Sequence, residues 1–218
     1  QYATNGLRLY PLGGIICILL PVLTILSFEG TLMGLREIRR HFQRERRSAI
    51  RRFRKQKRLN SLASPGRYEF IIVLDHLKPF FNIGKIFRSA DAFGAAEVHL
   101  IATDFFDPAP AKGSFKWVPA KFHNDFSSGY EELVEREYTL FGMEPACGED
   151  LAFLKLPEKS AFIFGNEEFG HRFNKADYPQ IKLLKIHQVG KVQSLNVSIA
   201  ASILMYEYVK QNGGGSTD

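Results

Sequence analysis

The feature that most constrains the fold is an alternation of short apolar runs with segments of helical periodicity, which begins after Arg67. The apolar runs are rich in β-branched and aromatic residues, as in strands that are buried on both faces. Between them, apolar residues recur at every third or fourth position, as in helices. This alternation predicts an α/β domain with a mostly parallel sheet and helices on both faces. The expected strands are 69–74, 97–102, 139–143, 161–164 and 182–186, and the expected helices are 83–93, 130–137 and 194–211.

Composition and length agree with a folded domain of ordinary size and an appendage. The chain has 218 residues, of which 45% are apolar and 24% charged. Its two cysteines, Cys17 and Cys147, exclude a disulfide framework and a cysteine-rich zinc module. They suit a reducing compartment, so we expect the protein to be cytoplasmic.

The first 32 residues form a separate, apolar region. Residues 15–28 are almost purely apolar, but Pro21 interrupts them and a membrane span needs about 20 residues. Because the first methionine is Met33, region 1–32 is either sequence upstream of the native start or a segment packed on the domain or a partner. We expect the rest to divide into a basic helix and linker (33–66), the α/β domain (67–212) and a flexible tail (213–218).

A strongly basic segment follows. Residues 35–58 contain 12 Lys/Arg against Glu37 and Glu45, a net charge of +10, and the whole chain carries +6, which leaves −4 for the rest. The apolar spacing predicts an amphipathic helix over 34–58. A solvated helix normally mixes charges of both signs, whereas like charges repel unless a polyanion is present. RNA, DNA or an anionic membrane surface could each supply the negative charge that offsets this repulsion.

A first motif joins the first strand to its helix. Asn82 stands near the expected helix start, and Arg88 follows six residues later. Ligands of open α/β sheets collect at the carboxyl ends of the strands, where Asn82 is placed. Considered alone, Asn82 would be interpreted as a helix cap and Arg88 as an ordinary surface arginine.

A second motif, 164–170, has Gly165 and Gly170 around a polar turn that contains Glu167. Glycines let a backbone approach a ligand closely. The motif matches neither a Walker loop nor a dinucleotide fingerprint, and alone it reads as a strand-to-helix turn.

A third motif, 185–201, follows the last strand. Ser194, Leu195 and Asn196 open the final helix after a loop that contains Gly190. Serine and asparagine at a helix start are ordinary caps.

The three motifs together, in this order and spacing, resemble the SpoU (TrmH-like) branch of the SPOUT RNA methyltransferases over roughly 70–210. The resemblance implies a C-terminal deep trefoil knot, a homodimer, and S-adenosylmethionine (SAM) as the cofactor with no metal. It also implies methylation of a ribose 2′-hydroxyl of tRNA or rRNA. The short basic extension on a small domain slightly favours tRNA, by analogy.

The resemblance also implies roles for individual residues. The family usually has Pro-Met where this chain has His187 and Gln188, which affects the adenine pocket. The implied catalytic residues are Arg88, Asn82, Glu167, Ser194 and Asn196, and the implied cofactor-binding residues are Met143, Gly165, Ile186, Ser194 and Leu195.

The basic helix is then expected to supply most of the RNA affinity, because the body is acidic. Phe115, Lys116, Trp117 and Lys121 offer a second RNA contact, although we favour Trp117 in the core or in a dimer interface. The expected RNA-binding residues of the helix are Arg39, Arg40, Arg44, Arg47, Arg51 and Arg54.

Two other readings remain open. A non-catalytic RNA-binding protein of the same fold is the first alternative. A membrane-surface protein, combining the apolar residues 15–28 with the basic helix, ranks last.

Overall fold

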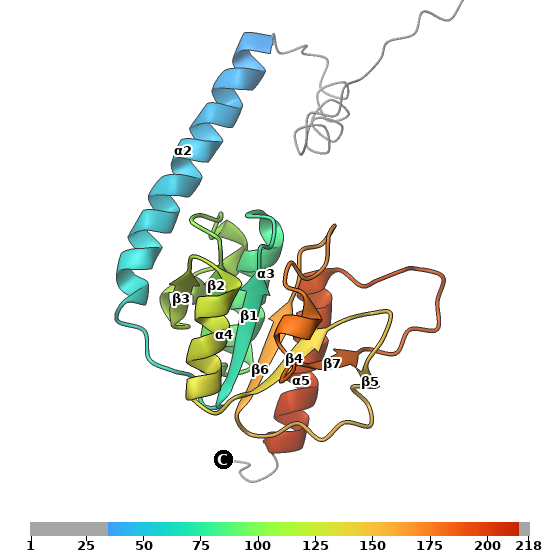
Figure 1. Ribbon diagram of the computed structural model, residues 1–218. Helices are drawn as coiled ribbons and strands as arrows, with labels where there is room; N and C mark the ends of the chain where they lie inside the picture. The colour runs from blue at the N-terminus through green and yellow to red at the C-terminus, as the bar shows by residue number, and fades with distance from the viewer. Residues whose placement is uncertain (1–34, 214–218) are drawn as a thin grey trace, which may run out of the picture. The chain divides into compact units, whose positions relative to one another are not determined.

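The computed structural model describes residues 35–213, and its central element is a sheet of seven strands (Figure 1). The strand order is β3-β2-β1-β6-β4-β7-β5, and every neighbouring pair is parallel. The expected α/β fold is therefore confirmed. The strands are β1 (Phe70–Asp75), β2 (Glu97–Ile101), β3 (Ala120–His123), β4 (Thr139–Met143), β5 (Glu149–Asp150), β6 (Ser160–Phe164) and β7 (Lys182–Lys185), and the helices are α2 (Leu35–Asn60), α3 (Phe81–Ala92), α4 (Phe126–Glu135) and α5 (Val197–Asn212).

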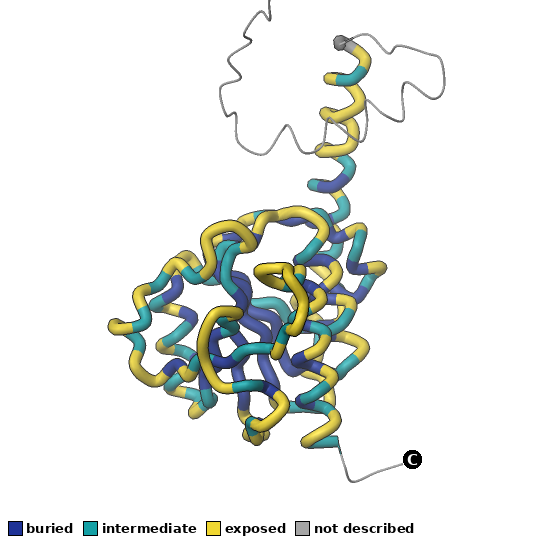
Figure 2. Tube along the Cα trace, turned by 90° about the vertical axis from the view of Figure 1, so that its right-hand side faces the viewer, coloured by how far each residue is buried: buried dark blue, intermediate teal, exposed yellow. Residues whose placement is uncertain are grey.

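Both faces of the sheet are buried, as a parallel sheet requires. Alternate residues of β1 point to opposite faces, so Ile72 packs in one apolar cluster and Ile71 in another. The first cluster contains residues of α3 and α5, and the second contains residues of α4. Figure 2 shows the buried segments concentrated in the strands, with exposed loops around them.

Two strands were not expected from the sequence. β3 is only partly buried along its length, and β5 consists of the two polar residues Glu149 and Asp150. Both are edge strands of the sheet, so they lack the apolar signature of the central strands. α4 also begins four residues earlier than expected, because Asp125 caps it by accepting a hydrogen bond from Ser128 N at 2.8 Å.

α2 crosses the boundary between two structural units, 1–46 and 47–218. In the second unit, Phe53 is buried and its ring lies 5.3 Å from that of Phe106 and 5.6 Å from that of Phe115. Arg52 pairs with Asp107 at 3.2 Å. The carboxyl half of the basic helix is therefore part of the core of this unit.

Asn60 is the last residue of α2 and is buried, although the sequence analysis placed it in the linker that follows the basic helix. Its Nδ2 donates to the carbonyl oxygens of Phe115 and Val118, each at 2.7 Å, and its Oδ1 accepts from Ala120 N at 3.1 Å. The expectation that Asn60 belongs to a linker is wrong, because these three bonds tie the helix end to the segment before β3.

None of the helices within residues 35–213 is long and apolar enough to cross a membrane. The apolar residues 15–28 and most of the expected tail lie outside the described residues.

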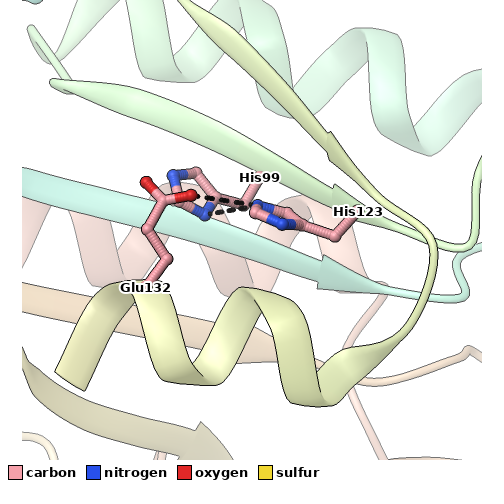
Figure 3. Close-up of side chains that lie close together, drawn as sticks. All are labelled: His99, His123 and Glu132. Atoms are coloured by element: carbon pink, nitrogen blue, oxygen red, sulfur yellow. Dashed lines mark hydrogen bonds and ion pairs between the residues drawn. The ribbon is translucent and has the colours of Figure 1, made fainter. Parts of the chain in front are cut away.

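Two histidines and a glutamate meet on the face of the sheet that α4 covers (Figure 3). His123 Nε2 lies 3.1 Å from His99 Nδ1 and 3.9 Å from Glu132 Oε2. Such groups can bind metal ions, and their ligand atoms lie within 4.8 Å of one another. The Glu132 carboxylate also pairs with Lys121 and Arg136. The positive charges of these two side chains would repel a divalent metal ion at this position. The cluster is thus part of an ion-pair network.

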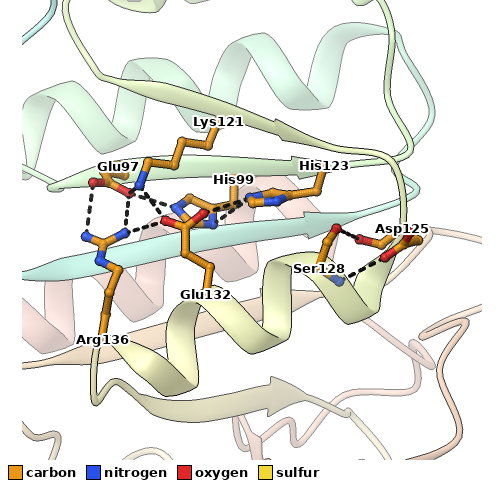
Figure 4. Close-up of polar contacts among 8 residues, drawn as sticks. All are labelled: Glu97, His99, Lys121, His123, Asp125, Ser128, Glu132 and Arg136. Carbon is orange, nitrogen blue, oxygen red and sulfur yellow. Dashed lines mark hydrogen bonds and ion pairs between the residues drawn. The ribbon is translucent and has the colours of Figure 1, made fainter.

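Glu97 is the centre of this network (Figure 4). Arg136 donates to both of its carboxylate oxygens, at 2.8 and 3.0 Å. His99 Nε2 donates to Oε2 at 2.8 Å, because a carboxylate can only accept, and His99 Nδ1 lies 3.1 Å from His123 Nε2. Burial alone would raise the pKa of Glu97, but the hydrogen bonds from His99 and Arg136 outweigh it and hold that pKa far below its ordinary value.

We expect Glu97→Gln to lower the free energy of unfolding by about 2–4 kcal/mol at neutral pH, because Arg136 loses the carboxylate that accepts two of its hydrogen bonds and keeps only its pair with Glu132. A carboxylate with a lowered pKa stabilises the fold above its unfolded-state pKa, about 4.5 here, and this stabilisation is lost as pH falls towards the folded-state pKa. The difference between the two proteins should therefore shrink below that pH. Urea unfolding between neutral and acidic pH measures it, with exposed Glu135→Gln as the control. A pH-independent difference would contradict the assigned ionisation.

Candidate active site

A cavity of about 770 Å³ opens at the carboxyl ends of β4, β6 and β7. The starts of α3 and α5 form its other walls, so segments far apart in the sequence meet here. Its volume lies within the range of small-molecule sites, about 300–1,000 Å³. The lining residues that the argument uses are Lys78, Asn82, Lys85, Met143, Glu144, Gly165, Glu167, Ile186, Gln188, Ser194, Leu195 and Asn196.

Three polar side chains from the three motifs form a continuous hydrogen-bond chain in this cavity. Asn196 Nδ2 donates to Asn82 Oδ1 at 3.3 Å, and Asn82 Nδ2 donates to Glu167 Oε1 at 2.9 Å. Asn196 also caps α5, because its Oδ1 accepts from Ser198 N at 3.0 Å. The chain fixes which end of each amide points to its neighbour, and it leaves a carboxylate at the cavity wall.

Glu167 is held from a second side as well. Its Oε2 accepts from Lys78 N at 3.1 Å, and Lys78 Nζ donates to Glu168 Oε2 at 2.8 Å. Both oxygens of the Glu167 carboxylate therefore accept from donors of residues 78–82, which run from the loop after β1 into the first turn of α3. This arrangement sets the orientation of the carboxylate by two bonds.

The turn that carries Glu167 is a closed loop, and it does not lead into a helix. Asn166 and Gly170 exchange backbone hydrogen bonds at 2.8 and 2.9 Å. Asn166 Nδ2 donates to the carbonyl oxygen of His76 at 2.7 Å, which fastens the turn to the end of β1. The expectation of a strand-to-helix turn is therefore wrong. At Gly165, a Cβ would lie only 2.4 Å from the carbonyl carbon of Gly170, so a side chain has no room there.

Eight of the nine residues expected in the site line the cavity, and Arg88 does not. Arg88 is exposed on α3, two turns beyond Asn82, which corresponds to about 9 Å along the helix axis. Asn82 and Lys85 line the cavity at a spacing of three, and Arg88 continues that spacing. The structure thus places Arg88 beyond the cavity on the same helix, outside the hydrogen-bond chain.

The sequence analysis missed the lining residues Glu144 and Lys85, and it named Gln188 only as a departure from the residues usual in the family. Glu144 and Lys85 add charges of opposite sign to the wall, and Gln188 contributes an amide whose buried Oε1 has no hydrogen-bond partner within the described residues. Behind Met143, His171 Nε2 donates to the Met143 carbonyl at 2.9 Å, and burial lowers the pKa of His171. The position of Glu144, directly after a buried strand, was a usable signal; nothing in the sequence marked Lys85.

Two parts of the expectations for the 115–121 loop are wrong, namely the RNA contact of Phe115 and the position of Trp117 in the core. Phe115 is buried, so it cannot contact RNA, and Trp117 is 56% exposed, so it is not a core residue. Lys121 is held in the Glu97 network.

These features define an α/β protein whose ligand site lies in the crevice at the carboxyl ends of parallel strands, as in cofactor-binding enzymes. The model of the SpoU rRNA Methylase family matches residues 69–206. The chain belongs to this family.

Named relatives agree with this assignment. The chain is 29% identical over 175 residues to the tRNA (guanosine(18)-2′-O)-methyltransferase of Thermus thermophilus, a match that covers 77% of this chain and 86% of the relative. It is 29% identical over 150 residues to a 23S rRNA (guanosine-2′-O-)-methyltransferase of Bordetella pertussis, covering 66% of this chain and 60% of the relative.

A solved structure is also similar. The SpoU methyltransferase AviRb of Streptomyces viridochromogenes, in complex with AdoMet, superposes with a TM-score of 0.61 and 27% identity, covering 70% of this chain and 61% of that chain. The expected family, fold class and cofactor, and 2′-O-methyl transfer to RNA as the family's reaction, agree with these comparisons.

We expect Gly165→Ala to weaken cofactor binding at least tenfold and to lower the melting temperature, because its Cβ would overlap the Gly170 backbone. Gly190→Ala is the matched control, since a Cβ there meets nothing within 4 Å. Calorimetric titration with SAM and thermal unfolding of both variants measure the two effects. Equal behaviour of the two variants would contradict the packing described for this turn.

Proposed function

We propose that this protein transfers the methyl group of SAM to a ribose 2′-hydroxyl of tRNA or rRNA. The observation that carries the proposal is the hydrogen-bond chain from Asn196 through Asn82 to Glu167, which brings all three motifs to one cavity. The Thermus thermophilus relative, 86% of which is matched, favours tRNA as the substrate class.

The residues present fit SAM. The buried, unpartnered Oε1 of Gln188 suits the exocyclic amino group of an adenine. The carboxylates of Glu144 and Glu167 at the cavity wall suit the positive charges of a sulfonium and an amino group. We assign cofactor binding to Met143, Gly165, Ile186, Ser194 and Leu195, within a C-terminal segment that we propose to be knotted.

Bound SAM supplies an activated methyl group on its sulfonium, so this chain's residues have to orient the ribose and handle its proton. A guanidinium stays protonated and cannot serve as a base. We therefore assign to Arg88 the stabilisation of negative charge that develops on the 2′-oxygen, while the hydroxyl proton passes to a phosphate oxygen of the RNA. Glu167 and Asn82 position the cavity wall against which the ribose is placed, and Ser194 and Asn196 fix the start of α5.

We propose that the protein acts as a homodimer in the cytoplasm. α5 exposes Ile199, Ile203 and Tyr206, which are spaced by four and three residues and so share one helix face. An uncovered apolar face of this kind supports association of two copies. The proposed cytoplasmic location is supported by the proposed substrate, since tRNA and rRNA are present there.

We assign RNA binding to the basic face of α2. Its candidate residues are all exposed, as phosphate contacts require, and the −4 charge of the rest of the chain offers no comparable surface. The six candidates are Arg39, Arg40, Arg44, Arg47, Arg51 and Arg54.

We expect Arg88→Ala to lower methyl transfer to RNA by about 10²–10³-fold while SAM affinity changes less than twofold, since Arg88 lies outside the cavity. Transfer of labelled methyl groups and calorimetric titration measure the two quantities, with exposed Arg67→Ala as the control. Full turnover of Arg88→Ala would refute the assignment. If the unaltered protein bound SAM but methylated no RNA, the non-catalytic RNA-binding alternative would replace the proposed function.

Changing Arg39, Arg40, Arg44 and Arg47 together to Gln should weaken RNA binding, with SAM affinity unchanged. Each lost phosphate contact lowers the slope of log K against log salt by about 0.7–0.9, so a decrease of about 3 is expected. Fluorescence anisotropy of labelled RNA across a salt series measures this slope. An unchanged slope would exclude this helix face from RNA binding. The control changes four exposed lysines of the body, Lys155, Lys159, Lys182 and Lys210.

A further inference from the structure

Trp117 is the only tryptophan of the chain, and more than half of its side chain is exposed. It follows the short 3₁₀ helix Ser114–Lys116. A tryptophan carries more apolar surface than any other residue. Because Trp117 is exposed, folding does not gain much of the free energy that burial of this surface would contribute. The mechanism proposed above gives Trp117 no role.

Two exposed leucines stand next to this ring. Leu59, Leu62 and Trp117 line one shallow groove, and Leu62 is 80% exposed. Lys116 Nζ lies 4.8 Å from the centre of the indole ring, so the groove has an apolar floor with a cation at its side. A flat aromatic ring beside a cation suits a nucleobase with its neighbouring phosphate.

The groove is held in a fixed shape. Phe115, two residues before Trp117, is buried against Phe53 of α2. Asn60 binds the carbonyl oxygens on either side of Trp117, those of Phe115 and Val118. The segment that carries the tryptophan is therefore fixed to the end of α2 in advance of any ligand, which lowers the entropy cost of binding.

A strongly positive surface continues from the same place. Leu59 also lines a second groove, together with Arg51, Arg54, Lys55 and Arg58. Residues 51–58 contain six Lys/Arg and no acidic residue. This charge complements a polyanion and disfavours an ordinary protein surface as the occupant.

We propose that Trp117, Leu59 and Leu62 form a stacking site for an unpaired base of the RNA, whose phosphates bind the adjacent cations of α2. The base must be unpaired, because bases in a duplex do not expose their faces. This inference rests on the proposed function only in taking RNA as the ligand.

The stacking site is separate from the methyl-transfer cavity. Trp117 precedes β3, at the amino end of that strand, whereas the cavity lies at the carboxyl ends of strands that run parallel to it. Loss of the stacking site should therefore raise the KM for RNA and leave SAM affinity unchanged.

The lone tryptophan makes the test direct, because all tryptophan fluorescence of the full chain comes from this site. A single-stranded oligouridylate should quench the emission with a saturable curve, and a blunt RNA duplex of equal charge should quench it less. Trp117→Ala should weaken single-strand binding by about 5- to 100-fold, measured by anisotropy of labelled RNA. Trp117→Phe should retain most of the affinity, since it keeps an aromatic face.

Phe153→Ala is the matched control, because Phe153 is also an exposed aromatic residue and lies outside both grooves. Unchanged emission on RNA binding, or equal affinity of Trp117→Ala, would overturn the stacking site. Emission that responds to protein concentration but not to RNA would also overturn it, by making Trp117 a contact between copies. Methyl transfer by the unaltered protein is scored separately, so quenching without transfer would refute the proposed function and support the stacking site.

Discussion

The candidate active site depends on the carboxylate of Glu167. One of its oxygens accepts from Asn82 at the start of α3 and the other from the backbone of Lys78 in the loop before that helix, so two bonds join the turn after β6 to this part of the chain. Asn196 extends the chain to the start of α5. These three segments are far apart in the sequence, and without these bonds only the packing of the sheet would align them. In the proposed function, cofactor binding and alignment of the ribose both depend on this connection.

The carboxyl half of α2 serves a second purpose besides carrying charge. Phe53 inserts into the aromatic cluster of the body, and Asn60 holds the segment before β3. A helix held only by its charges would bind RNA without orienting it. Here the inner face of the helix is fixed by apolar contacts and Asn60, and its outer face remains free for phosphates. RNA gripped by this half would have a defined orientation on the body.

The sequence predicted the central strands and the helices well, because buried parallel strands and amphipathic helices leave strong apolar patterns. The predictions failed at the edge strands of the sheet, such as β5, which consists of Glu149 and Asp150. They also failed at Trp117, because a tryptophan is usually buried and this one is exposed. Apart from Met143, which the family resemblance supplied, the site residues came from three motifs whose individual residues all had ordinary structural interpretations. Their meeting in one cavity, and the extra lining residue Lys85, depend on tertiary packing that no local pattern encodes.

The position of β7 has a consequence for synthesis of the chain on the ribosome. β4 and β5 both precede β7, yet β7 lies between them and pairs with each. A nascent chain therefore keeps an open edge on β4 until residues 182–185 emerge. The walls supplied by Ile186 and by the start of α5 come later still. A product that terminates before β7 would hold most of the apolar core but no complete cavity, so the cavity is complete only after residues 182–200 have been synthesised.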